Sequence, residues 1–309
     1  MKILITGGTH GMGKGVAKIL AGTDQHRHEI IILCRSKNAG EATIKEIAKT
    51  TLNNHISYVL CDLTKFSEVK NVIHEIHEKH QYLDGLFINA GLGYASQRLE
   101  TAHGLDAHFQ VNYLAQFMLT LNLIDLLEKS PGGGRVIFNV TRGGQIFWDD
   151  LQLINLWSYE KAIHQAMVAK RMFLAKLHRL YQETSAPGIA FIGFEIPKPV
   201  WTNQLNIIPA SMRLMATIMK LFGRFISIDR CGQIMAPLFT ENQEDSLKKS
   251  GKLITWKKNK FVEIPEDAQA LNQLQQDKLW RMSMDLCGDK HTIDLAHNLE
   301  SKNVLAIKI

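Results

Sequence analysis

Short apolar segments alternate along most of the chain with longer segments of helical periodicity. The apolar segments are nearly continuous, which is typical of parallel strands covered on both faces. We predict strands at Ile3–Thr6, Ile30–Cys34, Ile56–Leu60, Leu86–Asn89, Val136–Val140 and Ile189–Phe194. We predict helices near 13–22, 39–50, 66–80, 105–128, 158–183, 210–226, 229–240 and 266–286. This alternation predicts an α/β fold with a doubly wound, mostly parallel sheet and helices on both faces.

The pattern continues without a composition shift, repeat or low-complexity linker, so we predict one domain over 1–309. The segment 197–262 departs from the alternation. We expect it to lie over the carboxyl ends of the strands, where ligands bind in such folds. It would then act as a lid over the substrate.

The segment 210–228 within this lid region has an amphipathic helical pattern. Its polar positions form one narrow stripe: Arg213, Thr217, Lys220 and Arg224. Its remaining surface is apolar and rich in methionine, which adapts to irregular shapes: Met212, Met215 and Met219. We predict a cover for a large apolar ligand. Contact with a membrane surface, a dimer interface and an ordinary core helix are the alternatives.

A glycine-rich turn follows the first predicted strand and opens a helix. Gly7, Gly11 and Gly13 form the pattern Gly-x-x-x-Gly-x-Gly, whereas a plain strand-to-helix joint needs one glycine. Glycine lets the backbone approach a phosphate closely, and the helix start directs free N–H groups at it. The pattern therefore predicts a dinucleotide site in a Rossmann fold. The candidate contacts in this loop are Gly7, Thr9, His10, Gly11, Met12 and Gly13.

Arg35 follows the second predicted strand, at the position that distinguishes the two nicotinamide cofactors. An acidic residue there would bind the ribose hydroxyl of NAD, whereas arginine suits a 2′-phosphate. Arg35 therefore favours NADP(H), with His10 and Lys37 placed to assist. A solvated surface arginine is the alternative.

Composition narrows the partners and the compartment. The chain has 309 residues, 45% of them hydrophobic, and a formal net charge of +6. No basic run with interleaved aromatic residues is present, so we expect no nucleic-acid partner. The four cysteines are scattered, which predicts a reducing compartment and no metal site. A strand beginning at residue 2 leaves no room for a signal peptide, and no apolar stretch is long enough for a transmembrane helix. We therefore expect a cytoplasmic protein.

Several segments together resemble the short-chain dehydrogenase/reductase superfamily, nearest to its retinol-dehydrogenase-like and protochlorophyllide-reductase-like members. They are Thr6–Gly13, Cys61–Leu63, Asn89–Gly91 and Val111–Leu114, with a weaker match at Pro197–Thr202. The resemblance covers most of 1–290.

The resemblance implies roles for single residues around the cofactor. Asp62 would hold the adenine amino group, and Leu63 would pack against the ring. Asn89, Ala90 and Gly91 would line the ribose side. Thr202 would contact the nicotinamide amide or the phosphates. Lys198 stands where the family has glycine, which places a charge beside the nicotinamide or leaves it in solvent.

The catalytic motif of the family is incomplete in this chain. The reaction needs a tyrosine as proton donor, a lysine four residues later and a serine. None of the six tyrosines is followed by such a lysine. The resemblance matches the family's helix with Lys170 kept and Ala166 in place of tyrosine. It puts Thr141, or with a shift of one residue Arg142, at the serine position. Asn112 would complete the tetrad and hold a water-linked proton relay. Satisfying a local backbone kink is its alternative role.

The missing tyrosine leaves three outcomes open. Another group donates the proton, the substrate needs no strong acid, or nothing is catalysed. Tyr94 is the best-placed donor by topology, although such a loop tyrosine commonly serves only packing. The further candidates are His164, Lys170, Lys198 and Arg142.

We therefore predict an NADP(H)-binding oxidoreductase with a degenerate tetrad. It would reduce a carbonyl, C=C bond or imine of a hydrophobic small molecule. Its proposed site residues are Asn112, Thr141, Lys170 and Tyr94. A catalytically silent NADP(H)-binding protein and a non-redox cyclase or isomerase are the alternatives. The apolar faces of the helices over 105–128 and 158–183 allow either a homodimer or core packing.

Overall fold

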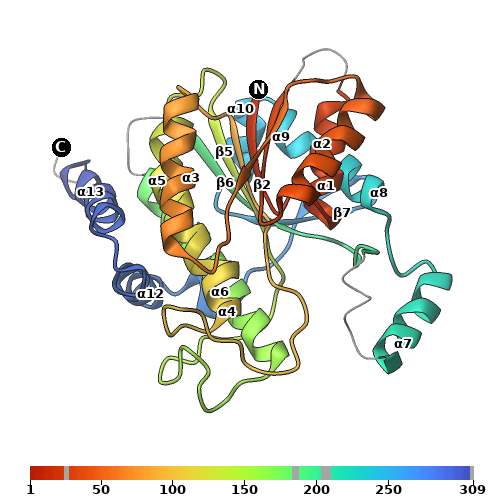
Figure 1. Cartoon of the computed structure of the whole chain (residues 1–309). Coiled ribbons are helices and arrows are strands. Elements are labelled where there is room, and N and C mark those ends of the chain that lie inside the picture. Colours follow the sequence, from red (N-terminus) through yellow and green to blue (C-terminus); the bar gives the residue numbers. More distant parts are fainter. Residues whose placement is uncertain (24–27, 183–187, 203–209, 307–309) are drawn as a thin grey trace.

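The computed structural model of the chain describes residues 1–23, 28–182, 188–202 and 210–306. Within these residues one sheet of eight strands forms the centre (Figure 1). The strands are β1 (Lys2–Thr6), β2 (Glu29–Cys34), β3 (Ile56–Leu60), β4 (Gly85–Ile88), β5 (Gly134–Asn139), β6 (Ile189–Glu195), β7 (Leu253–Lys257) and β8 (Lys260–Glu263). Their order is β3-β2-β1-β4-β5-β6-β7-β8, and only the β7–β8 pair is antiparallel.

Helices cover both faces of this sheet. They are α1 (Gly11–Ala21), α2 (Lys37–Thr51), α3 (Phe66–Lys79), α4 (Ala107–Phe109), α5 (Ala115–Glu128), α6 (Tyr159–Gln182), α7 (Ala210–Leu221), α8 (Ile228–Met235), α9 (Pro237–Thr240), α10 (Gln243–Lys249), α11 (Ala268–Leu271), α12 (Gln273–Cys287) and α13 (Lys290–Ala306). A π-helical turn (Gln110–Leu114) joins α4 to α5. Figure 1 places α1, α2 and α8 on one side of the sheet, and α3, α5 and α6 on the other. The predicted doubly wound α/β fold is confirmed.

The core consists of two apolar clusters, one on each face of the sheet. Their strand residues come from near-continuous apolar runs, because alternate side chains of one strand point into opposite clusters. α5 is buried almost all round, since α12 and α13 pack outside α5 and α6. Asn122 of α5 satisfies its amide by donating to Thr292 Oγ1 of α13, at 2.8 Å. A second helical layer therefore backs the crossover helices that frame the site.

The carboxyl-terminal third differs from the prediction. β7, β8, α10 and α13 were not predicted, and β7 and β8 lie inside the segment assigned to the lid. β7 pairs in parallel with β6, and a tight turn at Lys258 and Asn259 returns the chain into β8. Both turn residues have left-handed backbone angles, with φ of +50° and +59°. The sheet thus continues two strands beyond the predicted edge.

α8 packs against α1 with backbone contact. A Cβ added at Gly15 would lie 2.3 Å from the Ile228 carbonyl oxygen, and one added at Gly232 would lie 2.2 Å from the Gly15 oxygen. Only hydrogen at both positions permits so close a crossing. The chain that follows α7 is therefore anchored beside the glycine-rich turn.

Candidate dinucleotide site

A cavity of about 780 Å³ lies along the carboxyl ends of β1, β2, β4 and β5. Its volume is in the range of small-molecule sites, and this edge is where doubly wound sheets bind ligands. Most of the residues predicted from the sequence line it: Gly7, Thr9, His10, Gly11, Met12, Arg35, Asp62, Leu63, Asn89, Ala90, Gly91, Tyr94, Asn112 and Thr202. Segments far apart in the sequence thus meet at one edge of the sheet.

The glycine-rich turn forms a cradle of bare backbone. Gly7 has φ of +69°, and a Cβ at Gly13 would lie 2.5 Å from the Gly7 carbonyl oxygen. The first turn of α1 contains no acidic residue, and within the described residues the side chain of His10 does not cap it. The first N–H groups of α1 can therefore meet an anion. Thr202 Cγ2 lies 3.2 Å from where a Cβ on Gly11 would be, so Thr202 borders this cradle. These residues fit the pyrophosphate of a dinucleotide.

Arg35 and Asp62 line the cavity at the carboxyl ends of β2 and β3. Arg35 is exposed directly after β2. Asp62 accepts hydrogen bonds from the backbone N–H and the hydroxyl of Thr64, at 3.0 and 2.8 Å. Its carboxylate is therefore held in place by its own loop. Leu63 is buried beside it and supplies an apolar wall.

Asn112 has both a structural role and an unused donor. It lies in the π-helical turn, and its Oδ1 accepts a hydrogen bond from the Leu92 N–H at 2.7 Å. This bond holds the loop after β4, and it does not involve the backbone of the π-helical turn itself. Its Nδ2 is buried and has no hydrogen-bond partner among the described residues. A buried amide donor at a cavity wall is costly unless a ligand or water accepts from it.

On α6, the residues that line the cavity differ from those that the sequence predicted for the site, although all of them lie on one side of the helix. Ile163 and Met167 line it. Ala166 is fully buried in the core, and Lys170 is 1% exposed. Neither of these two belongs to the cavity wall in the described part of the chain. Met167 lies four positions after Ile163, which is the spacing expected for the tyrosine and the lysine.

Lys170 lies beneath the cavity instead. Its Nζ donates to the backbone oxygen of Asn139 at 3.3 Å, and Asn139 itself lines the cavity. Burial lowers the pKa of the Lys170 ammonium to about 7. Lys170 therefore changes charge near neutral pH inside the floor of the site.

The remaining predicted groups lie away from the cavity wall. The hydroxyl of Thr141 is buried without a partner among the described residues. Arg142 pairs with Glu195, its Nε 2.8 Å from Oε2. Lys198 donates to the Gly223 backbone oxygen at 2.8 Å. Of the donors proposed from the sequence, Tyr94 alone is among the described lining residues.

His108 is a lining residue that the sequence analysis missed. It is fully buried, and its Nε2 donates to the Gly93 backbone oxygen at 3.0 Å, so it supports the residue before Tyr94. Its Nδ1 has no partner among the described residues. The ring of Tyr159 packs against both, with its centroid 5.2 Å from that of Tyr94 and 5.8 Å from that of His108. A signal existed in the sequence, because His108 precedes Asn112 by four residues and shares its helix face.

Metal-binding clusters and membrane-spanning helices are both absent from the described residues. No cluster of histidine, cysteine and carboxylate side chains there is arranged to hold a metal ion. No helix there is both long and apolar enough to cross a bilayer.

A family model and two similar proteins all carry the description of a dehydrogenase. A family model described as short chain dehydrogenase matches residues 1–148. Polyprenol dehydrogenase of Homo sapiens is 31% identical over 183 residues, which cover 57% of this chain and 54% of that protein. Retinol dehydrogenase 12 of Mus musculus is 26% identical over 288 residues, which cover 93% of this chain and 86% of that protein. The match to the polyprenol dehydrogenase thus spans about half of its length.

The fold also matches solved structures. The structure titled RhlG/NADP active-site complex, from Pseudomonas aeruginosa, superposes with a TM-score of 0.61. It covers 82% of this chain and 93% of that chain at 17% identity. At this identity the likeness establishes the shared fold.

The buried Lys170 predicts a pH-dependent stability. Between about pH 7 and its ordinary value of 10.5, the unfolded chain holds a proton on Lys170 that the folded chain lacks, so stability rises with pH in this window. We expect Lys170→Met to raise the Tm, most strongly below pH 7, with a gain that shrinks toward pH 10. Each unit of pKa difference corresponds to about 1.4 kcal/mol. Thermal denaturation across this pH range measures the effect.

Lys176→Met in the same helix is the matched control. Lys176 is buried but paired with Asp277 and Glu300, at 2.8 and 2.7 Å, so its removal should lower the Tm. A Lys170→Met variant that is destabilised, or whose effect does not change with pH, would contradict the prediction.

Proposed function

Because the chain belongs to the short-chain dehydrogenase/reductase superfamily and is retinol-dehydrogenase-like, we propose that it binds NADP(H) and reduces a hydrophobic small molecule. The observation that carries this proposal is the continuity of the cavity. It joins the glycine cradle and Arg35 to the apolar pair Ile163 and Met167. A polar end holds the cofactor, and an apolar end accepts the substrate.

Arg35 supports NADP(H) rather than NAD. Its guanidinium is exposed at the cavity, where the 2′-phosphate of a bound cofactor would meet it. No acidic residue takes the position directly after β2. The NADP complex of the structurally similar Pseudomonas aeruginosa protein is in keeping with this choice.

The chain's own residues would divide the work in the bound state. The first turn of α1 and Thr202 would hold the pyrophosphate, and Asp62 and Leu63 the adenine. Asn112 Nδ2 would donate to a water or to the ligand. When bound, reduced nicotinamide supplies a hydride, and the oxygen of a carbonyl acceptor then needs a proton.

We place the family's tyrosine and lysine positions at Ile163 and Met167, in preference to Ala166 and Lys170. The side chains of Ile163 and Met167 face the cavity at the required spacing, whereas Ala166 is enclosed by core residues. At these positions the chain has neither an acid nor a cation. This apolar pair also favours the second candidate function, NADP(H) binding without turnover.

Tyr94 is the proton donor that we propose for a catalytic cycle. It lines the cavity, and the ring of Tyr159 packs against it at a centroid distance of 5.2 Å. His108 acts as a positioning residue, since its bond to the Gly93 oxygen fixes the backbone next to Tyr94. The Tyr94 hydroxyl can thus be presented without the family's own tyrosine.

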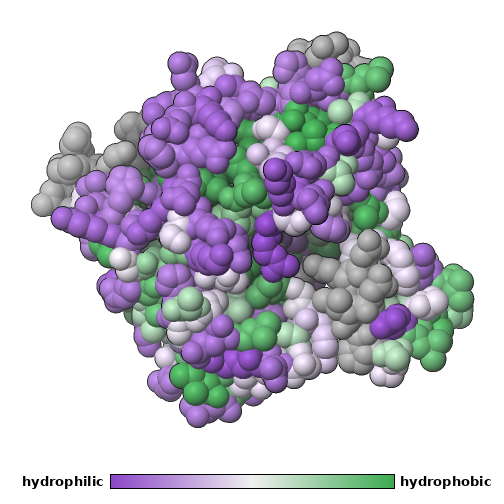
Figure 2. Space-filling view, viewed as in Figure 1, coloured by the Kyte–Doolittle hydropathy of each residue, from purple (hydrophilic) through white to green (hydrophobic). Residues whose placement is uncertain are grey.

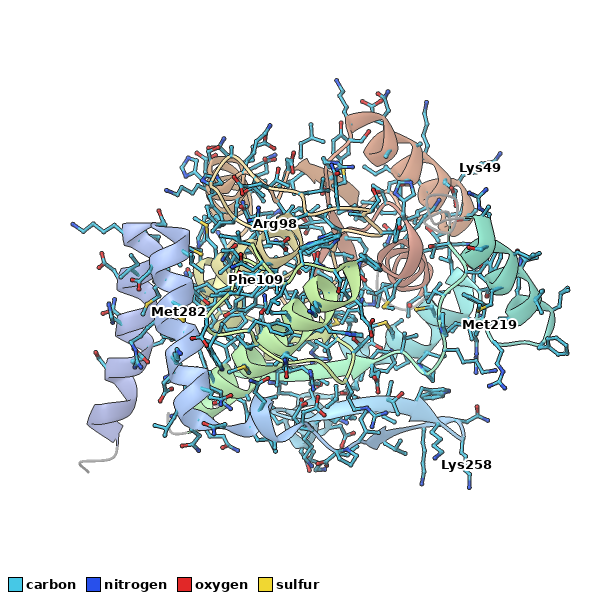
Figure 3. The ribbon with its side chains drawn as sticks, turned by 90° about the horizontal axis from the view of Figure 1, so that it is seen from below. Lys49, Arg98, Phe109, Met219, Lys258 and Met282 are labelled. Carbon is cyan, nitrogen blue, oxygen red and sulfur yellow. The ribbon has the colours of Figure 1, made fainter. Side chains whose placement is uncertain are left out.

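The cofactor preference predicts the effect of removing the charge of Arg35. Arg35→Gln should weaken NADPH binding about 10- to 100-fold and leave NADH binding nearly unchanged, because a hydrogen bond to a charged group contributes about 1.5–3 kcal/mol. Fluorescence titration with both cofactors measures this. Lys49→Gln, an exposed change at the far end of α2, is the control (Figure 3). Equal losses for both cofactors would refute the assignment to the 2′-phosphate.

Turnover tests the reaction itself. The wild-type protein should oxidise NADPH in the presence of at least one class among hydrophobic ketones, enones and imines. Tyr94→Phe should lower kcat for a ketone about 10²- to 10⁴-fold without changing NADPH affinity. Tyr82→Phe should have no effect, because Tyr82 lies near Lys2 at the opposite edge of the sheet. Tight NADPH binding without turnover of any class would favour the silent alternative, and absence of binding would contradict both functions.

The placement of the catalytic positions has its own test. Ile163→Tyr combined with Met167→Lys should raise NADPH-dependent carbonyl reduction at least about 100-fold, because it restores a positioned acid. Ala166→Tyr should lower the Tm without such a gain, because the site is fully buried and overpacking costs about 1–3 kcal/mol or more. A folded Ala166→Tyr variant that gains activity, beside an inactive double variant, would show that Ala166 and Lys170 hold these positions.

A further inference from the structure

α7 and the residue that follows it form an exposed apolar ridge. Its members, which we call the α7 ridge, are Leu214, Met215, Ile218, Met219, Leu221 and Phe222, all of them exposed. Leu221 is 82% and Phe222 78% exposed. Figure 1 shows α7 standing away from the sheet, and Figure 2 shows hydrophobic surface at the same place. A contiguous apolar surface of this kind marks an interaction site.

The apolar side of α7 faces away from the protein. Lys220 on the polar side places its Nζ 4.1 Å from the ring centroid of Trp201, and Ala216 is buried. Helical geometry puts the ridge on the side opposite these two residues. In Figure 3, α7 with its labelled Met219 lies at the periphery of the molecule. A helix that served only to cover its own cavity would turn its apolar side inward.

The base of this segment is held firmly next to the cavity. Trp201 N–H donates to the Ile226 oxygen and Ile226 N–H to the Pro199 oxygen, both at 3.0 Å. The rings of Trp201 and Phe225 pack edge to face at 5.2 Å. Val200 and Thr202, in the same stem, line the cavity. The ridge is therefore presented in a defined orientation beside the candidate site.

The charge of the segment points to the partner. The sequence contains no aspartate or glutamate from Ile196 to Ile228 but contains Lys198, Arg213, Lys220 and Arg224. Cationic residues beside an exposed apolar helix face are the combination that binds an anionic membrane interface. A second copy of the chain would bring the same positive charges to the contact, so like charges would oppose it.

We propose that the α7 ridge docks the protein on the surface of an anionic lipid bilayer. The ridge side chains would enter the boundary between headgroups and acyl chains, while the exposed Arg224 just after the end of α7 would remain at the phosphate level. This interaction does not depend on the proposed oxidoreductase activity. It would bring the cavity to a surface that contains lipophilic molecules.

Vesicle flotation tests the docking. The full-length protein should float with phosphatidylcholine vesicles that contain phosphatidylserine, and less with phosphatidylcholine alone or at high salt. Leu221→Asp combined with Phe222→Asp should reduce binding more than tenfold. Leu271→Asp combined with Leu274→Asp is the matched control, since these leucines are also exposed, at 57% and 81%, and should leave binding unchanged. Arg224→Glu should weaken binding, and the exposed Arg281→Glu should not.

Hydrogen exchange of the wild-type protein provides a measurement that needs no variant. Amides of α7 should exchange more slowly after addition of the phosphatidylserine vesicles. Unchanged exchange in α7, or no flotation of the wild type with anionic vesicles, would overturn the proposal. So would equal binding by the Leu221→Asp/Phe222→Asp variant. A wild-type dimer that this variant converts to monomer would assign the ridge to a second copy of the chain instead.

Discussion

The site depends on one hydrogen-bonded junction between the carboxyl ends of β1 and β4. The Thr6 hydroxyl donates to the Phe87 oxygen at 2.9 Å and accepts from the backbone N–H groups of Asn89 and Ala90, at 2.8 and 2.9 Å. The Asn89 amide returns to the Thr6 oxygen at 2.9 Å. A Cβ on Gly13 would lie 2.7 Å from Asn89 Nδ2, so the first turn of α1 fits against this junction only as bare backbone. Strand ends, glycine turn and helix start therefore fix one another.

The same network continues through the floor of the cavity to α6. Asn139 donates to Asn89 Oδ1 at 3.3 Å, and Lys170 donates to the Asn139 oxygen at 3.3 Å. Deeper in α6, buried Arg171 and Lys176 pair with carboxylates outside the helix. Each of these pairs restricts the rotation of α6 about its axis, since an unpaired buried charge is costly. α6 is thus held in the orientation in which Ile163 and Met167 line the cavity and Ala166 is buried in the core.

The sequence was sufficient for the parts of the fold and site that local patterns encode. Near-continuous apolar segments indicate buried parallel strands, and the glycine pattern indicates the turn that opens α1. The strands from β1 to β6 were predicted close to their observed bounds. The rotation of α6 has no local signal, because Ile163, Ala166 and Met167 are all apolar and Arg171 and Lys176 read as surface charges. β7 and β8 are short and partly exposed, and their lysine-rich turn resembles a loop. Asn259 suits a tight turn, but Lys258 and Lys260 flank it where the strongest hairpin signal has glycine after asparagine.

The two ends of the cavity differ in what they can stabilise. At the glycine cradle, N–H groups and Arg35 favour negative charge. The side chains of Ile163 and Met167 themselves offer no donor to an oxygen that gains charge, and an unpaired charge in apolar surroundings is costly. Hydride addition to a neutral ketone creates such a charge unless Tyr94 supplies a proton in the same step. Hydride addition to an iminium ion instead neutralises its positive charge. The apolar wall therefore opposes that transition state less than it opposes the one for a ketone. Binding such a cation against apolar side chains has its own desolvation cost, so neither kind of acceptor is favoured by the wall alone, and carbonyl reduction would depend on Tyr94.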